Sequence, residues 1–96
     1  MLRNDLISLI QKNRTDLTKL GVKSLSIFGS VARGEARPDS DVDVLVEFEG
    51  ATTFDRFMDT KFYLEDLLGC KVDLAVAQSI KPRLKKNIMR DLIHVT

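Results

Sequence analysis

The most restrictive feature of this sequence is a pair of aspartates at the start of a segment that otherwise has the composition of a buried β-strand. The segment Val42–Phe48 is rich in β-branched and aromatic residues, and Asp41 and Asp43 stand two residues apart at its beginning. Residues two apart in a strand share one face, with about 6 to 7 Å between their Cα atoms. Two like charges held this close raise each other's pKa unless a cation lies between them. The segment therefore predicts a strand that carries a carboxylate pair.

A third aspartate interrupts another hydrophobic segment further along the chain. Asp73 lies in the stretch Val72–Val76 and points away from the side that carries its hydrophobic neighbours. If this strand lies beside the first, Asp73 stands next to Asp43. Carboxylate oxygens suit Mg²⁺, which a few carboxylates commonly hold together with substrate phosphate. The pattern predicts two carboxylates for metal and one placed to take a proton from an incoming hydroxyl.

A turn suited to anionic ligands precedes the aspartate pair. Gly29 follows the hydrophobic stretch 24–28, and a glycine after a strand lets the backbone approach a ligand closely. Ser30 adds a hydroxyl at the start of a short helix, where free N–H groups attract anionic oxygens. Arg33 returns to the same face and could reach the same phosphates, or it could pair with Glu35 on the surface. The turn predicts a triphosphate clamp that faces the carboxylates.

The composition limits the chain to one compact domain and excludes several functional classes. Its 96 residues, 44% of them hydrophobic, suffice for one modest core, so we expect a single domain over residues 1–96. The 15 basic and 14 acidic side chains give a net charge of +1 without a block of like charge, so direct nucleic-acid binding is not expected. No apolar run has membrane-spanning length, and one cysteine cannot form an internal disulfide. We therefore expect a cytoplasmic protein without a membrane contact.

Hydrophobic periodicity gives the element order α-β-α-β-α-β-α, which is typical of an α/β (α+β) domain. The predicted elements are a helix over residues 2–20, a strand over 24–28, a short helix over 30–33, a strand over Val42–Phe48, a helix over 54–68, a strand over 71–76 and a helix over 80–92. The tail 92–95 can pair as a short edge strand. Arg83, Lys86 and Arg90 give the last helix a basic side that is either solvated or able to meet an acidic partner.

Other residues receive structural assignments. The phenylalanines between Phe54 and Phe62 are expected in the core, and Cys70 is expected to be buried or half-buried. His94 is assigned no catalytic role. Asp41 by itself could cap the turn that precedes it, but a cap would explain one carboxylate and not three.

The motif residues resemble those of a known enzyme superfamily. The segment Gly29-Ser30-Val31-Ala32-Arg33-Gly34, followed by Ser40-Asp41-Val42-Asp43 and by Asp73 on a later strand, resembles the signature of the polymerase-β-type nucleotidyltransferases, in particular their minimal branch, the MNT domains. The resemblance implies the nucleotidyltransferase fold, with a small mixed β-sheet flanked by helices. It implies that Asp41 and Asp43 bind two Mg²⁺ ions on ATP, and that Asp73 completes the metal site and acts as general base. Gly29 and Ser30 would hold the phosphates, with Arg33 and, more weakly, Ser40 in the same nucleotide-binding set.

The same resemblance implies a partner and a function. MNT proteins are typically encoded beside a HEPN-domain protein, a ribonuclease toxin, and neutralise it by moving AMP from ATP onto a tyrosine. By this resemblance the chain is the antitoxin of a type VII-like HEPN/MNT toxin–antitoxin pair, a protein adenylyltransferase (AMPylator) in a hetero-oligomer with its toxin. Two other interpretations stay open: neutralisation by binding alone, and nucleotide transfer to a small molecule, which the lack of a second domain to enclose the acceptor disfavours.

Overall fold

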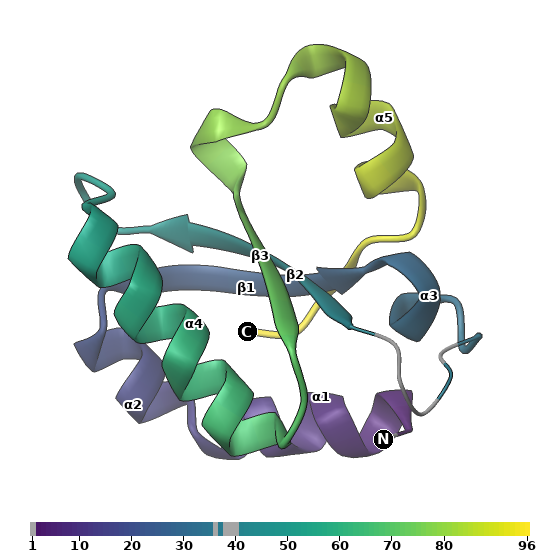
Figure 1. Cartoon of the computed structure of the whole chain (residues 1–96), viewed down its shortest axis with the longest axis horizontal. Helices are drawn as coiled ribbons and strands as arrows, with labels where there is room; N and C mark the ends of the chain where they lie inside the picture. Colours follow the sequence, from purple (N-terminus) through teal and green to yellow (C-terminus); the bar gives the residue numbers. More distant parts are fainter. Residues whose placement is uncertain (1, 36, 38–40) are drawn as a thin grey trace.

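The chain alternates helices and strands along most of its length. The computed structural model describes residues 2–35, 37 and 41–96, so Ser40 lies outside the described residues. Its elements, drawn in Figure 1, are α1 (Arg3–Lys12), α2 (Arg14–Lys19), β1 (Val22–Phe28), α3 (Gly29–Ala32), β2 (Val42–Phe48), α4 (Phe54–Leu68), β3 (Val72–Val76), the short 3-10 helix η1 (Ala77–Ser79), α5 (Pro82–Arg90) and β4 (Ile93–His94). Among the described residues, no helix is both long and apolar enough to cross a membrane.

In the part of the chain that the structure describes, four strands form one mixed sheet in the order β3-β2-β1-β4. β1 is antiparallel to both β2 and β4, whereas β2 and β3 are parallel. Parallel neighbours need a long crossover connection, and α4 supplies it. The sheet is therefore mixed and flanked by helices, as predicted, and the tail of the chain pairs at the edge of the sheet as β4.

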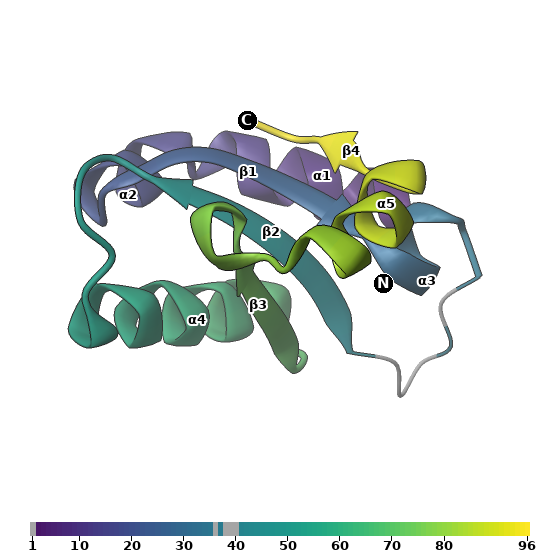
Figure 2. The same cartoon turned by 90° about the horizontal axis from the view of Figure 1, so that it is seen from above.

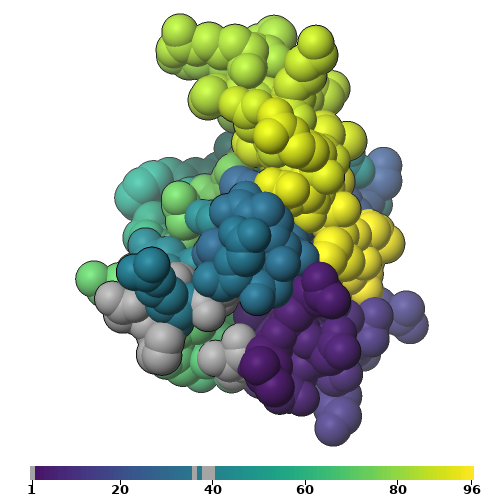
Figure 3. Space-filling model, turned by 90° about the vertical axis from the view of Figure 1, so that its right-hand side faces the viewer, coloured from purple at the N-terminus to yellow at the C-terminus, as the bar shows by residue number. Residues whose placement is uncertain are grey.

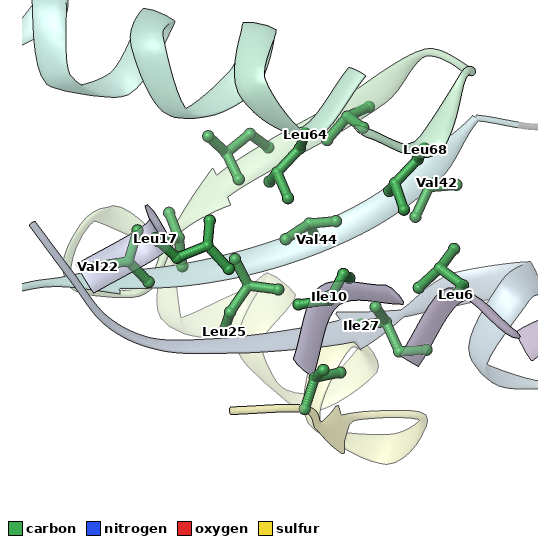
Figure 4. Close-up of a cluster of buried hydrophobic side chains, with 14 of the residues drawn as sticks. Leu6, Ile10, Leu17, Val22, Leu25, Ile27, Val42, Val44, Leu64 and Leu68 are labelled. Atoms are coloured by element: carbon green, nitrogen blue, oxygen red, sulfur yellow. The ribbon is translucent and has the colours of Figure 1, made fainter. Parts of the chain in front are cut away.

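One face of the sheet carries the hydrophobic core. Side chains of β2 alternate between buried and half-buried along the whole strand, so Val44 and Val46 point into the core while Asp43 and Leu45 point the other way. Helices α1, α2 and α4 lie below the sheet in Figure 1 and supply buried leucine and isoleucine side chains, seen in Figure 4. Viewed from above in Figure 2, η1 and α5 lie in front of the opposite face. That second face is the one on which the polar residues of the strands are displayed.

Residues 2–20 form two helices, so the prediction of a single helix is wrong. α1 ends at Lys12 and α2 begins at Arg14, with Asn13 between them in a non-helical conformation (φ −107°, ψ 21°). The Asn13 side chain donates a hydrogen bond of 2.8 Å to the backbone carbonyl of Leu9. Asparagine side chains compete in this way for backbone hydrogen bonds, which lowers their helix propensity. The apolar periodicity continues through the break and therefore does not reveal it.

For the other helices and strands, the predicted ends agree best with the structure in the middle of the chain. β2 and α4 have the predicted ends, whereas β1 begins two residues earlier than expected, at Val22. The helix predicted over residues 80–92 is shorter, and the turn η1 precedes it. Pro82 begins this helix because proline lacks the N–H that the first helical position leaves unpaired anyway. None of the residues of α5 is buried.

The prediction of core positions for the phenylalanines of α4 is wrong for two of them. Phe54 is 77% exposed and Phe62 is 54% exposed, whereas Phe57 packs against the core. The residues that α4 buries, Thr60 and Leu64 among them, follow one another at four-residue intervals. Phe62 lies about 200° around the helix axis from Thr60, because each residue advances the helix by about 100°. Apolar residues occur on more than one side of α4, and the sheet covers only one side.

Candidate active site

The structure brings Asp43 and Asp73 side by side. They are register partners in the parallel pair of β2 and β3, on the face of the sheet opposite to the core. Asp43 is half-buried and Asp73 is exposed. Asp41 precedes β2 by one residue and is exposed as well. β2 and β3 are therefore neighbours, which the sequence could state only as a condition. Their adjacency brings the predicted carboxylates together at the start of both strands.

Hydrogen bonds fix the beginnings of the two strands that carry these carboxylates. The backbone N–H of Val42 donates to the carbonyl of Lys71 at 3.0 Å. The N–H of Val72 donates to Oε2 of Glu65, in the last turns of α4, at 3.1 Å. Buried backbone groups that lack such partners would cost free energy, so these bonds hold the register against slippage. A shift of one residue would turn Asp43 into the core.

Gly29 borders the site at the end of the neighbouring strand β1. β1 ends at Phe28, the register partner of Asp43, so the chain turns at Gly29 beside the carboxylate. Gly29 has φ +72°, a left-handed conformation that residues with a side chain rarely adopt. A Cβ atom at Gly29 would overlap the carboxylate oxygen Oδ2 of Asp43. The turn therefore requires glycine, and the half-buried Ser30 follows directly after this contact.

The surroundings of Asp43 disfavour its charged form. Burial is the largest effect that raises the pKa of Asp43, and the negative charges of Asp73 and Asp41 raise it further. The positive charge of Arg33 acts in the opposite direction and lowers this pKa. Burial combined with neighbouring like charges is typical of functional sites, where a bound ligand compensates the repulsion.

The carboxylates have the donor chemistry of a magnesium site. As they stand, no three Asp, Glu, His or Cys side chains within residues 2–35, 37 and 41–96 converge closely enough to enclose an ion. The donor set still fits Mg²⁺, because Asp41, Asp43 and Asp73 offer hard oxygen ligands whose mutual repulsion a divalent cation would offset. Because Gly29 has no side chain, the carboxylate of Asp43 lies directly against the backbone of the turn. The residues present thus suit a divalent cation.

Arg33 forms two ion pairs at the edge of this site. Its Nε lies 3.0 Å from Oε2 of Glu35, and its Nη1 lies 2.9 Å from Oδ2 of Asp91. The hydrogen bonds to Glu35 and Asp91 raise the pKa of Arg33. The predicted alternative of a surface pair with Glu35 is confirmed, while contact with phosphate stays a prediction. No sequence pattern indicated the pair with Asp91, because Asp91 lies 58 residues away along the chain.

A cavity lies beside the carboxylates on the same face of the sheet. It has a volume of about 390 Å³ and extends from β1 and β2 to η1 and α5. Leu45, which lines it, follows Asp43 by two residues and shares its face of β2. The other lining residues are Ser24, Ser26, Glu47, Ala77, Gln78, Ile80, Lys85, Met89, Leu92 and His94. Its size is that of a typical small-molecule site. The alternation of side chains along β2 could have identified this face of the sheet from the sequence. The cavity itself depends on the path of η1 and α5, and no sequence pattern predicts that path.

Comparison with known families agrees with this geometry. The family model described as the nucleotidyltransferase domain matches residues 8–95, nearly the whole chain. The chain belongs to the nucleotidyltransferase family. Within this family, it is 39% identical over 89 residues to the protein adenylyltransferase MntA of Thermococcus cleftensis, an alignment that covers 92% of this chain and 90% of that protein.

Solved structures support the same assignment of the fold. A structure assigned to the minimal nucleotidyltransferases matches with a TM-score of 0.83 and 38% identity, over 97% of this chain and 95% of the other. The complex of a tri-AMPylated Shewanella oneidensis HEPN toxin with an MNT antitoxin matches with a TM-score of 0.68 and 16% identity, over 94% of this chain and 71% of the other. At that identity the second likeness concerns the fold alone. The predicted minimal nucleotidyltransferase fold is confirmed.

Proposed function

We propose that this nucleotidyltransferase is a Mg²⁺-dependent protein adenylyltransferase that transfers AMP from ATP to a tyrosine of a HEPN-domain toxin and so acts as its antitoxin. The observation that carries the proposal is the register pairing of Asp43 with Asp73, beside a turn at Gly29 that only glycine fits. Similarity to the Thermococcus MntA protein supports AMP as the transferred group and a protein as the acceptor. The likeness in fold to an MNT antitoxin in complex with its HEPN toxin supports the partner.

The donor nucleotide would lie across the face of the sheet. The backbone at Gly29 and the hydroxyl of Ser30 would hold the triphosphate, while Asp41, Asp43 and Asp73 would hold Mg²⁺. Once bound, Mg²⁺ supplies positive charge that neutralises the phosphates and stabilises the attacking and leaving oxygens. The nucleoside would extend along β2 into the cavity of about 390 Å³ that begins at Leu45.

The acceptor oxygen would attack the α-phosphorus in line with the leaving group. A bond forms between the tyrosine oxygen and the α-phosphorus, and the bond from that phosphorus to the oxygen bridging to the β-phosphate breaks, so pyrophosphate leaves with the electron pair. Asp73 would take the proton from the tyrosine hydroxyl. It suits this role because it is exposed and lies in β3, the outermost strand on this side of the sheet.

The experiment that tests this function is intact-mass spectrometry of a HEPN-domain candidate partner, after incubation with this chain, ATP and Mg²⁺. We expect mass gains in AMP-sized steps that require both ATP and Mg²⁺. The gains should vanish with Asp41→Asn/Asp43→Asn and persist with the control Asp59→Asn/Asp66→Asn, which removes two exposed carboxylates from α4. A partner of unchanged mass that forms a tight complex would contradict the enzymatic proposal and favour an antitoxin that acts by binding alone.

A further inference from the structure

α5 is attached to the fold differently from the other long helices. Both α1 and α4 bury residues, whereas α5 buries none; Leu84 is 48% exposed and Met89 is 50% exposed. Figure 3 shows this yellow-green segment projecting from the body of the molecule. No acidic side chain occurs in residues 81–90, and in the described part of the chain no ion pair involves any of its five cations, Lys81, Arg83, Lys85, Lys86 and Arg90. The helix thus presents exposed apolar groups together with uncompensated positive charge.

A groove of about 340 Å³ runs between this helix and the end of β3, the strand at the outer edge of the sheet. Val76, Ile80, Leu84 and Ile88 give it an apolar lining, and Lys81 and Arg83 add positive charge. With Ala75 and Ser79, these six residues form the β3–α5 groove. It shares Ile80 with the cavity of about 390 Å³ but faces a different side of α5.

The β3–α5 groove lies close to the carboxylate proposed to act on the acceptor. Ala75, which also lines the groove, shares a face of β3 with Asp73. Residues two apart in a strand have Cα atoms about 6 to 7 Å apart. A molecule seated in the groove would therefore pass next to Asp73. The proposed triphosphate site lies toward β1 and Gly29, and the proposed nucleoside cavity lies on a different side of α5. The position suits the acceptor rather than the donor.

We propose that the β3–α5 groove docks the acceptor protein through an acidic segment that also carries exposed apolar side chains. This inference rests on the proposed function in one respect, that the acceptor is a protein. Cations around an apolar groove attract carboxylates and accelerate encounter, while apolar anchors in the groove supply most of the lasting affinity. The partner would in this way supply part of the surface that positions the acceptor hydroxyl.

The lining favours a protein over a nucleic acid as the occupant. Single-stranded nucleic acid is typically bound by cations together with aromatic side chains on which the bases stack. The groove has no aromatic lining residue among those described. Its aliphatic side chains offer instead the kind of apolar centre found in protein–protein interfaces.

The test compares Lys81→Glu/Arg83→Glu with the control Lys12→Glu/Lys19→Glu. Both variants change the net charge equally, and the control residues lie exposed on α1 and α2, at the opposite face of the sheet. Acidic residues at the beginning of a helix interact favourably with its dipole, so the groove variant should keep α5 folded, which circular dichroism checks. Binding of the purified HEPN-domain protein is measured by calorimetry without ATP, at two salt concentrations. We expect the groove variant to weaken binding by about tenfold or more, with a shallower salt dependence, and the control to stay within about twofold.

A second variant and a second readout keep the outcomes distinct. Leu84→Ser/Ile88→Ser should also weaken binding while the salt dependence is retained. In the transfer assay, the groove variant should raise KM for the acceptor and leave KM for ATP unchanged. Unchanged binding of the HEPN-domain protein by both variants would overturn the inference. If the groove variants weaken binding but the wild type transfers no AMP, the proposed function is wrong. The docking surface would still be supported.

Discussion

The carboxylate site and α5 lie on the same face of the sheet but are built in opposite ways. Around Asp43, the backbone is fixed by strand register on both sides and by a glycine turn that leaves no room for another atom. α5 contributes nothing to the core and is tied at its C-terminal end by the ion pair between Arg33 and Asp91. Chemistry on a phosphate needs reacting groups fixed closely, whereas recognition of a partner tolerates adjustable side chains. The rigid backbone therefore positions the carboxylates, and the loosely held helix α5 is left for contact with a partner.

The largest expected effect is at the rigid site. Asp73→Asn should lower the rate of AMP transfer by about 10² to 10⁴-fold, the usual contribution of a general base. Because Asp73 is exposed and its substitution by asparagine conserves shape, the fold should be unchanged. Single-turnover rates and the thermal unfolding midpoint measure the two properties together. A rate within about twofold of the wild type would remove Asp73 from the catalytic machinery.

The next prediction compares Gly29, in the turn at the site, with Gly50, which has a similar backbone conformation outside the site. Gly29 and Gly50 both have φ +72°, but a Cβ atom would meet Asp43 at Gly29 and nothing within 4 Å at Gly50. Gly50→Ala should cost about 1 to 2 kcal/mol in the free energy of unfolding, from backbone strain alone. Gly29→Ala should cost more and should also displace the Asp43 carboxylate, which lowers the rate of AMP transfer. Urea unfolding of both variants gives the difference; equal costs with retained activity would show that the close approach to Asp43 is dispensable.

A smaller effect concerns the electrostatic conflict at Asp43. Its pKa is raised above the ordinary value of 3.8, so the folded chain binds more protons than the unfolded chain in the pH range just above that value. The wild type therefore loses stability as pH rises through this range, and Asp43→Asn should not. At neutral pH the variant should be more stable by up to about 1 kcal/mol, since water screens a half-exposed group, and the advantage should disappear in acid.

Thermal unfolding measured from low to neutral pH checks this sign. Addition of Mg²⁺ provides an independent readout, because it should stabilise the wild type and have less effect on Asp43→Asn. A variant less stable than the wild type at neutral pH would mean that the carboxylate repulsion is already relieved in the folded chain.

The smallest effect is expected at α5. Asp91→Asn removes one of the two partners of Arg33, an exposed ion pair that contributes less than about 1 kcal/mol. Hydrogen exchange of the α5 amides should accelerate by up to about fivefold, while exchange in β1 and β2 stays unchanged. Lys23→Gln, which breaks the exposed pair between Lys23 and Glu47, is the control and should leave α5 unaffected. Equal acceleration in the strands would contradict the picture of an independently held helix.

Local patterns in the sequence predicted much of the fold. The bounds of β2 and α4 follow from the β-branched run 42–48 and from the stop at Gly69, which adopts the left-handed conformation expected of a helix-ending glycine. The break at Asn13 and the exposure of Phe54 and Phe62 were not predictable in the same way. A helix can carry apolar residues on several sides, and which side is buried depends on where the sheet lies.

What the sequence by itself determined is the chemical inventory of the site: a glycine turn, a carboxylate pair on one face of a strand, and a lone carboxylate on another strand. These follow from local geometry, in which residue spacing fixes the direction of a side chain. Tertiary structure decided that β3 pairs with β2 in the register that joins Asp73 to Asp43, that Arg33 meets Asp91, and that η1 and α5 enclose one cavity and border the β3–α5 groove. Contacts between segments far apart in the chain depend on packing of the whole core, which no short stretch of sequence encodes.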